Sequence, residues 1–209
     1  MISDTLNCIF VHIPKTGGSS IEDVLWPGER TEAHLWQGMV GRYHNRYQTG
    51  GLQHLRADQI RDAVGEERFA RSYRFSFVRN PWDRAVSQYA YMLQKKYLRD
   101  FAGMNEDDSF PRYLSLIQER RHVQWTPQCE FLFDASGTCL VDFIGRFERL
   151  REDAAAVFEN LNVPGAELPH SRASEHRPYV EYYDADTKRV IEHLYGNDIE
   201  RFSYKFGES

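Results

Sequence analysis

Short apolar runs alternate with amphipathic segments through the first half of the chain. Residues 6–13 and 73–78 are runs rich in β-branched or aromatic side chains, each bounded by polar or glycine-rich sequence. Such runs are typical of strands buried inside a sheet. Each is followed by apolar residues at helical spacing, over residues 21–25 and 85–93. Two strand–loop–helix units predict an α/β fold with a central, mainly parallel sheet flanked by helices.

Turn and cap signals predict further elements. Residues 55–64 favour a short helix that ends at Gly65, and Asn80–Pro81 fits the N-cap and first residue of the helix after the second strand. Residues 130–148 are interpreted as a strand, a turn and a second strand, and a last long helix is expected to stop at Gly196. No linker rich in Gly, Ser or Pro divides the chain, so residues 1–209 are expected to form one domain.

The charge composition of the chain limits the kinds of ligand that it is expected to bind. The chain has 31 acidic and 26 basic side chains, a formal charge of −5. A protein that binds nucleic acid through bulk electrostatics normally has the opposite sign, so no nucleic-acid partner is expected. With 41% hydrophobic residues the chain has enough apolar material for a core. An anion would have to bind in a local basic pocket.

Three cysteines, Cys8, Cys129 and Cys139, are widely spaced and form no CxxC motif. They are interpreted as reduced thiols, and no metal site is expected. The sequence shows neither a targeting segment nor an apolar run that could span a bilayer. We therefore expect a soluble, cytoplasmic protein without membrane insertion; its oligomeric state cannot be predicted.

The segment from residue 10 to residue 20, FVHIPKTGGSS, leads from a strand through a glycine pair into a helix. Glycines let backbone N–H groups approach an anion, and a helix N-terminus favours negative charge. Lys15 adds a mobile positive charge, and Ser19 or Ser20 could open the helix. The lysine precedes the glycines, unlike the lysine of the nucleotide-triphosphate loop GxxxxGK[ST]. The alternative is a tight turn carrying a surface lysine.

A second strand ends on Arg79 and enters a helix in the same way, over residues 75–87, FSFVRNPWDRAVS. The carboxyl edge of a parallel sheet would present Arg79 to a ligand. Ser87 lies on roughly the same helix face as Asn80 and Arg84. A guanidinium and a hydroxyl that converge on one point suit a phosphate monoester. The alternative is an ion pair between Arg79 and a carboxylate together with a helix cap, which leaves Ser87 without a role.

These two segments together resemble the two cofactor loops of sulfotransferases that use 3′-phosphoadenosine 5′-phosphosulfate. The likeness is closest to the carbohydrate-type branch, which includes heparan 2-O- and chondroitin-type enzymes and bacterial relatives. Residues 12–20 resemble the 5′-phosphosulfate loop of that branch, and residues 77–89 resemble its 3′-phosphate loop. The likeness continues through residues 141–148 and 198–204. It implies a P-loop-type three-layer fold and a sulfotransferase, here a soluble and bacterial one.

The resemblance implies roles for the loop residues. Lys15 approaches the oxygen that links phosphate to sulfate, where a cation stabilises charge on the leaving phosphate. Arg79 and Ser87 bind the 3′-phosphate, and Arg177 belongs to a late loop that can close over the nucleotide. The 5′-phosphate is held by the loop residues Thr16, Gly17, Gly18, Ser19 and Ser20.

The acceptor hydroxyl needs a general base, which is usually His or Glu. The resemblance implies a catalytic histidine or acid between the two loops, and His54 is the favoured candidate. The weaker rivals are His34, Glu32 and His12, and His12 is expected to be a packed core residue. His44 and His122 could equally be surface or acceptor-site histidines.

Residues 120–128, RRHVQWTPQ, resemble a stretch of the family near the acceptor cleft. Trp125 offers a flat face to a sugar ring, while Arg121 and Gln128 could reach hydroxyl or acidic groups. The alternative is a tryptophan packed under a loop. The expected acceptor is a hydroxyl of a carbohydrate or another small alcohol.

Two other function classes stay open from the residues alone. A P-loop kinase or hydrolase would need a metal-binding Ser or Thr after the loop lysine and an Asp at the end of a later strand, whereas this sequence has Arg79 there. A non-catalytic nucleotide-binding module could keep the fold, although the presence of both Lys15 and His54 disfavours it.

Overall fold

The computed structural model describes residues 1–34, 52–163, 165–169 and 176–208. The strands are β1 (Ile2–Ser3), β2 (Cys8–Val11), β3 (Tyr73–Val78) and β4 (Phe143–Arg146). The α-helices are α1 (Gly18–Leu25), α2 (Ala57–Val64), α3 (Glu66–Arg71), α4 (Pro81–Gln94), α5 (Lys96–Ala102), α6 (Phe110–Glu119), α7 (Cys129–Leu132), α8 (Leu150–Asn160) and α9 (Ala185–Arg201). Single 3₁₀ turns cover Glu32–His34, Leu52–His54, Val123–Trp125, Phe147–Arg149 and Tyr179–Tyr182.

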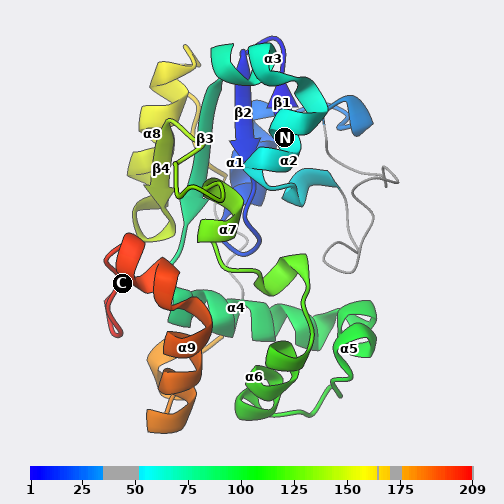
Figure 1. Ribbon diagram of the computed structural model, residues 1–209, viewed down its shortest axis with the longest axis vertical. Coiled ribbons are helices and arrows are strands. Elements are labelled where there is room, and N and C mark those ends of the chain that lie inside the picture. Colours follow the sequence, from blue (N-terminus) through cyan, green and yellow to red (C-terminus); the bar gives the residue numbers. More distant parts are fainter. Residues whose placement is uncertain (35–51, 164, 170–175, 209) are drawn as a thin grey trace.

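The sheet contains the strands in the order β1-β2-β3-β4. β2, β3 and β4 run parallel, with Phe10 opposite Phe75 and Phe75 opposite Phe143, and the short β1 is antiparallel at the edge. The sheet is therefore mainly parallel, as the sequence predicts, and β3 has the predicted bounds. Its parallel strands all end at the same edge, below which α4, α5, α6 and α9 lie (Figure 1).

Alternation along the strands decides which helices cover each face. On one face Phe10, Phe75 and Phe77 pack with residues of α1 and α8. On the other face Ile9, Val11 and Val78 pack with residues of α2 and α4. Since successive side chains of a strand point to opposite faces, both faces are apolar and both need cover. The result is the three-layer arrangement of helices, sheet and helices.

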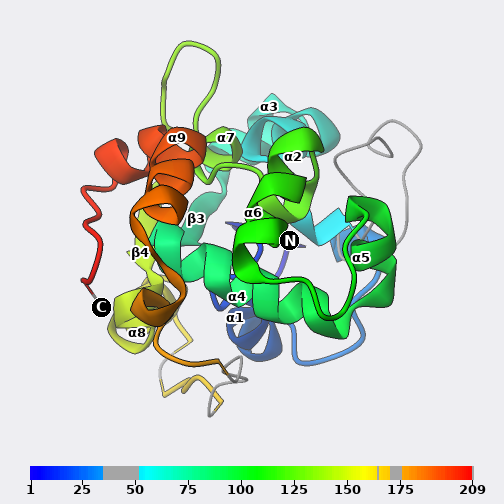
Figure 2. The same cartoon turned by 90° about the horizontal axis from the view of Figure 1, so that it is seen from below.

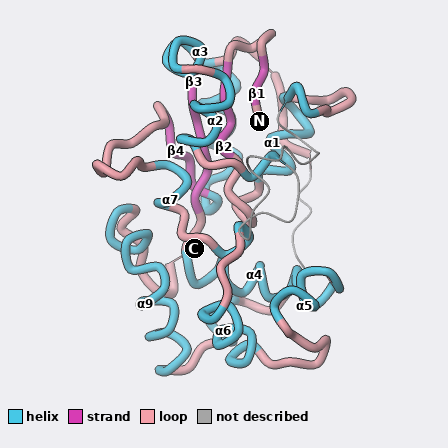
Figure 3. The backbone as a smooth tube through the Cα atoms, turned by 45° about the vertical axis from the view of Figure 1, so that its right-hand side comes forward, coloured by secondary structure: helices cyan, strands magenta, loops and turns pink. Residues whose placement is uncertain are grey.

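A helical region lies beyond the carboxyl edge of the strands. α4 crosses under the sheet, and α6 and α9 contact α4 and each other (Figure 2). Figure 3 shows the strands gathered at one end of the molecule and α4, α5, α6 and α9 at the other. Across the described ranges, no helix has both the length and the apolar character needed to cross a membrane.

Two of the sequence predictions are wrong in detail. The segment expected to be a strand after residue 130 forms α7, and only an isolated antiparallel bridge joins Phe133 to Cys139 across the predicted turn. The last helix does not stop at Gly196 but continues to Arg201, with a kink at Tyr195, where φ is −125° and ψ is 24°. α2 ends before Gly65 as predicted.

Candidate functional site

The loop between β2 and α1 has a tightly wound backbone. Gly17 has φ of 81° and is the N-cap of α1, and a Cβ at this position would lie 2.7 Å from Leu150 Cδ2. The positive φ therefore favours glycine, and a larger residue would also have to displace the Leu150 side chain. Thr16 is fully buried, and its Oγ1 donates a hydrogen bond to Ile13 O at 2.9 Å. The helix begins at Gly18, so the expectation that Ser19 or Ser20 opens it is wrong.

The same winding leaves backbone donors at the start of α1. The first N–H groups of a helix have no partner within the helix, and in α1 these belong to Gly18 and the serines after it. Ser20 N–H already bonds to Gly17 O at 3.1 Å. The helix N-terminus, the glycines and Lys15 together make a site suited to an anion.

Lys15 extends from this loop over α4. Its φ is 68°, and its Nζ lies 4.4 Å from the centroid of the Tyr91 ring. Lys95 Nζ lies 5.4 Å from the same centroid. Burial, followed by the positive charges of Arg79 and Lys95, lowers the pKa of Lys15 to about 8. Lys15 is therefore a cation whose protonation an incoming anion would stabilise.

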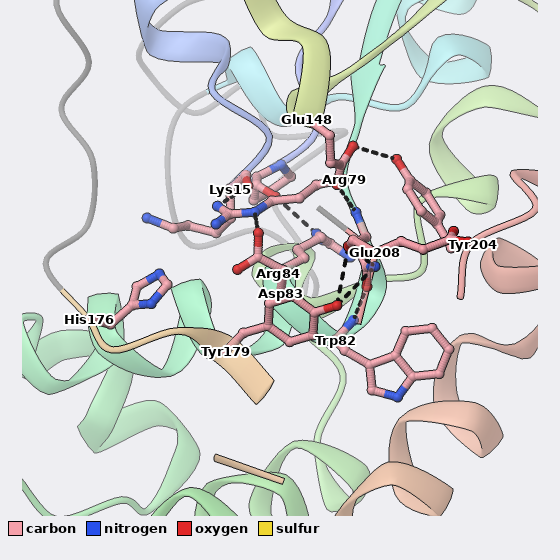
Figure 4. Close-up of polar contacts among 12 residues, drawn as sticks. Lys15, Arg79, Trp82, Asp83, Arg84, Glu148, His176, Tyr179, Tyr204 and Glu208 are labelled. Atoms are coloured by element: carbon pink, nitrogen blue, oxygen red, sulfur yellow. Dashed lines mark hydrogen bonds and ion pairs between the residues drawn. The ribbon is translucent and has the colours of Figure 1, made fainter. Parts of the chain in front are cut away.

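Arg79 joins the second loop to the first (Figure 4). It follows β3, and its Nη1 donates to Lys15 O at 3.2 Å while its Nε donates to Asp83 Oδ2 at 2.8 Å. Its guanidinium carbon lies 3.9 Å from the centroid of the Phe147 ring. The ion pair considered for this segment is therefore present, and Arg79 also faces the first loop.

The helix cap after Arg79 is confirmed. Asn80 Oδ1 accepts from Trp82 N–H at 3.1 Å, with Pro81 at the first helical position. Asn80 N–H itself donates to Glu148 Oε1 at 2.6 Å, and Glu148 Oε2 accepts from Tyr204 O–H at 3.1 Å. The β3–α4 junction is therefore tied to the segment after β4 and to the end of the chain.

Arg84 and Ser87 lie farther along the buried face of α4. Arg84 is buried, and its guanidinium bonds to backbone carbonyls. Its donors reach Pro14 O and Thr126 O at 3.0 Å each and Gln124 O at 3.4 Å. Ser87 is also buried, with 1% of its surface exposed.

His54 ends the 3₁₀ turn before α2 and is half-buried beside β2. Its Nδ1 lies 3.0 Å from His12 O, and the two imidazole centroids are 4.7 Å apart. Because a carbonyl oxygen only accepts, Nδ1 carries the hydrogen and Nε2 carries the lone pair. Burial, followed by the charge of His12, lowers the pKa of His54 well below its usual value. The imidazole is therefore neutral at pH 7.

The rival candidates for the base are placed differently. His12 is buried, as expected, and hydrogen-bonded to Glu22. His34 Nδ1 accepts from Thr31 N–H at 3.2 Å. His122 is 1% exposed, burial lowers its pKa to about 4, and its Nδ1 accepts from Gln124 N–H. His44 and the Glu32 side chain lie outside the described parts of the structure.

A cavity of about 300 Å³ opens between α6, the 3₁₀ turn at Val123–Trp125 and α9. Arg121 and Trp125 line it, but Trp125 is only 6% exposed, and its indole N–H donates to Arg120 O at 2.6 Å. Most of the Trp125 side chain is therefore packed inside the protein, as the alternative interpretation expects. Among the described residues, no group of three His, Cys, Asp or Glu side chains could hold a metal ion.

Two of the remaining candidates lie apart from this cavity. Gln128 is fully buried, with its Oε1 accepting from Arg79 N–H and its Nε2 donating to Arg79 O, both at 2.8 Å. Because the side chain is fully buried, Gln128 does not reach a surface where a substrate could bind, and its two bonds hold the backbone of Arg79. Arg177 is exposed, with Nη1 3.6 Å from Glu181 Oε2.

Sequence reasoning missed the ring beneath Lys15 and the carboxylate bonded to His12. Tyr91 lies one helical turn beyond Ser87 on the α4 face already singled out, so extending that face by four residues would have found it. Glu22 is fully buried. A glutamate that faces a buried strand leaves no comparable signal in one sequence.

Comparison with known proteins gives the family of the chain. The sequence model of a family described as "Sulfotransferase family" matches residues 1–205. An uncharacterized protein of Archaeoglobus fulgidus is 30% identical over 113 residues, covering 50% of this chain and 80% of that protein. Carbohydrate sulfotransferase 14 of Homo sapiens is 26% identical over 196 residues, covering 82% of this chain and 48% of that protein. The chain thus spans about half the length of this curated relative.

A solved structure shares the fold. The crystal structure of a sulfotransferase from Alicyclobacillus acidocaldarius superposes with a TM-score of 0.54, covers 93% of each chain and is 17% identical. This likeness supports the expected P-loop-type three-layer architecture. Since the family match extends over nearly the whole sequence, the chain belongs to the sulfotransferase family.

Proposed function

We propose that this protein transfers a sulfuryl group from 3′-phosphoadenosine 5′-phosphosulfate to a hydroxyl of a carbohydrate or another small alcohol, by in-line displacement. The observation that carries the proposal is the hydrogen bond from Arg79 Nη1 to Lys15 O. It brings the two strand-end loops together, so that cations from both loops face one region. A nucleotide with phosphate groups at both its 3′ and 5′ positions requires such a pair of anion sites.

The first loop fits a 5′-phosphosulfate. The N-cap Gly17 fills a place that a Cβ could not share with Leu150, and the backbone donors of Thr16 to Ser19, with the hydroxyls of Ser19 and Ser20, would hold the phosphate. Lys15 would neutralise the charge that develops on the leaving phosphate. The donor, when bound, would supply the activated sulfuryl group that is transferred.

The second loop fits a 3′-phosphate. Arg79 would bind it, with Asp83 and Gln128 fixing the direction of the guanidinium and its backbone. Ser87 and Arg177 complete the proposed nucleotide contacts. A planar guanidinium held from two sides loses little conformational entropy when it binds an oxyanion.

His54 is the proposed general base. Its neutral imidazole donates through Nδ1 to His12 O, so Nε2 is the atom that can accept a proton. The acceptor oxygen forms a bond to sulfur while its proton passes to His54 Nε2. The bond between sulfur and the bridging oxygen breaks, and the electron pair remains on the phosphate beside Lys15.

The acceptor is proposed to be a carbohydrate because a relative is named a carbohydrate sulfotransferase. The cavity lined by Arg121 and Trp125 is the proposed place for part of it. A kinase-like phosphotransferase is less well supported, because β3 leads to Arg79 where that chemistry needs a carboxylate for its metal.

Calorimetric titration with adenosine 3′,5′-bisphosphate, with and without Mg²⁺ and beside ATP, tests the donor. We expect metal-independent binding that weakens about 10-fold or more in Arg79→Met, since a hydrogen bond to a charged group contributes about 1.5–3 kcal/mol. Arg74→Met is the matched control, because Arg74 is the second residue of the same strand and pairs with Asp142 instead. Preferential binding of ATP with Mg²⁺ would contradict the proposal.

The rate of turnover tests the proposal that His54 is the general base. His54→Ala should abolish release of the bisphosphate from the sulfated donor in the presence of hydroxyl acceptors, while leaving bisphosphate affinity nearly intact. His34→Ala is the control, because the described hydrogen bonds of His34 go only to Thr31, three residues before it. An unchanged rate in His54→Ala would remove His54 from the mechanism.

A further inference from the structure

A buried pair, Glu22 and His12, lies between the anion loop and His54. Glu22 is 0% exposed and His12 is 6% exposed, and His12 Nδ1 lies 2.6 Å from Glu22 Oε1. A carboxylate only accepts, so His12 Nδ1 carries the hydrogen of this bond. Removing two ionisable groups from water is costly, and neither belongs to the proposed donor contacts. The burial of both groups at this position therefore needs a structural or functional explanation.

His12 touches the anion loop through its ring. A Cβ built on Gly18 would lie 2.2 Å from His12 Cδ2 and 2.3 Å from its Nε2. The imidazole therefore occupies the space directly against the first residue of α1, and only a glycine can stand there. The ring also stacks on Phe10, with centroids 5.3 Å apart. The His12 ring therefore packs directly against the first turn of α1.

His12 touches the proposed base through its backbone. His12 O accepts the Nδ1 hydrogen of His54 at 3.0 Å, and this bond selects the tautomer with a free Nε2. The His54 ring meets the His12 ring edge-on, with centroids 4.7 Å apart. One residue thus contacts both the loop that would hold the donor and the imidazole that would take the proton.

Glu22 fixes the rotation of the His12 side chain. It belongs to α1, one turn after Gly18, so the helix supplies both the backbone against the ring and the carboxylate that holds it. Arg30 Nη1 lies 3.7 Å from the other carboxylate oxygen, Oε2, which has no hydrogen-bond partner in the described part of the chain. The Glu22–His12 bond is therefore the main polar restraint on this carboxylate.

We propose that Glu22 and His12 are positioning residues that couple the donor loop to the orientation of His54. This inference rests on the proposed function for the identity of the base. Glu22 locks the His12 ring, the ring bears on Gly18, and the His12 carbonyl holds the tautomer of His54. A displacement of about 1 Å at a reacting group can cost about 100-fold in rate. The pair therefore acts on turnover more than on donor affinity.

The test is Glu22→Gln, which keeps the size of the side chain and removes its charge. We expect turnover to fall about 10- to 100-fold, while affinity for adenosine 3′,5′-bisphosphate changes less than about threefold. Asp153→Asn is the matched control, because Asp153 is also a buried helical carboxylate, yet it bonds to Arg146 N–H. It should leave turnover near the wild-type value.

A spectroscopic measurement separates positioning from simple loss of stability. In ¹⁵N spectra of the histidine rings, wild-type His54 should appear as the single tautomer with hydrogen on Nδ1. Added bisphosphate should shift its signals. In Glu22→Gln we expect a mixture of tautomers and a smaller response to bisphosphate, whereas Asp153→Asn should resemble wild type.

Two failures can be told apart. If bisphosphate does not bind the wild-type protein, the proposed function fails, and the tautomer of His54 still tests the pair. If bisphosphate binds while Glu22→Gln leaves turnover and tautomer unchanged, the coupling is refuted. A wild-type His54 ring that shows mixed tautomers, or no response to bound bisphosphate, would also refute it, even if the variant did not fold.

Discussion

Asp198, on α9, supports the proposed 3′-phosphate loop from a distance in the sequence. It is fully buried, and its oxygens accept the backbone N–H groups of Gln128 and Cys129 at 2.7 and 2.8 Å. Gln128 in turn bonds to both backbone groups of Arg79. Asp198→Asn keeps one acceptor and turns an amide NH₂ toward the second N–H. One buried donor then loses its partner, and the other loses a charged acceptor.

The size of the effect follows from these two losses. A hydrogen bond to a charged group contributes about 1.5–3 kcal/mol, and an orphaned buried donor costs about 1–3 kcal/mol. We expect a net loss of about 3 kcal/mol in the free energy of unfolding. In a chain of this length each kcal/mol lowers Tm by about 2–4 °C, so Tm should fall by about 6–12 °C. Affinity for adenosine 3′,5′-bisphosphate should fall as well, because Gln128 no longer holds Arg79.

Calorimetry measures Tm, and titration of the folded variant below its transition measures affinity. The control is Asp186→Asn, on the same helix, where an exposed carboxylate pairs with Arg189. An exposed pair of this kind contributes at most about 1 kcal/mol. A melting temperature for Asp198→Asn within about 2 °C of wild type would show that the reasoning about the buried carboxylate is wrong.

Three further predictions concern the loop lysine and the sheet. The protonated form of Lys15 binds an anion, and the pKa of Lys15 is about 8. Affinity for the bisphosphate should therefore decline as pH rises above 8, which titrations from pH 6 to pH 10 would measure. Lys95→Met removes a charge that lowers that pKa, so the decline should begin at higher pH; an unmoved midpoint would contradict this. Gly145→Ala places a Cβ 2.5 Å from Phe77 Cε1, and urea denaturation should report a loss of about 1–3 kcal/mol; no loss would contradict the packing.

The sequence was sufficient where local signals agree with tertiary structure. β3 is a continuous apolar run that ends at Arg79, and the Asn80–Pro81 cap follows it, so strand, cap and helix α4 could all be predicted. The shared edge of β2 and β3 also follows from two strand–loop–helix units, and it explains why Lys15 and Arg79 lie together.

The sequence was insufficient where a distant residue decides the structure. The segment at Cys129–Leu132 is apolar enough for a strand, but Asp198 accepts its first N–H groups from about 70 positions away and stabilises a helical turn. The kink in α9 lies at Tyr195, which also contacts a distant segment, since its O–H donates to Trp125 O at 2.9 Å. Gly196 therefore marks a bend in α9 and not its end.

The same limit applies to charge. Arg84 carries the same charge as Arg79 and lies five positions later, yet three backbone carbonyls accept its hydrogen bonds. The sequence shows that an arginine is present at position 84, but it does not show whether its guanidinium binds a ligand or other parts of the protein. The carbonyl oxygens of Pro14, Gln124 and Thr126, which surround the guanidinium, show that it binds the protein.

These contacts of Arg84 also have an evolutionary consequence. Its acceptors are the main-chain oxygens of Pro14, Gln124 and Thr126, and every amino acid offers such an oxygen. The residues at positions 124 and 126 can therefore drift among relatives without losing the bonds. No other side chain provides donors in the same planar fork, so position 84 cannot drift in this way. The side chains of residues 124 and 126 could therefore change while Arg84 keeps this segment attached to the loop between β2 and α1.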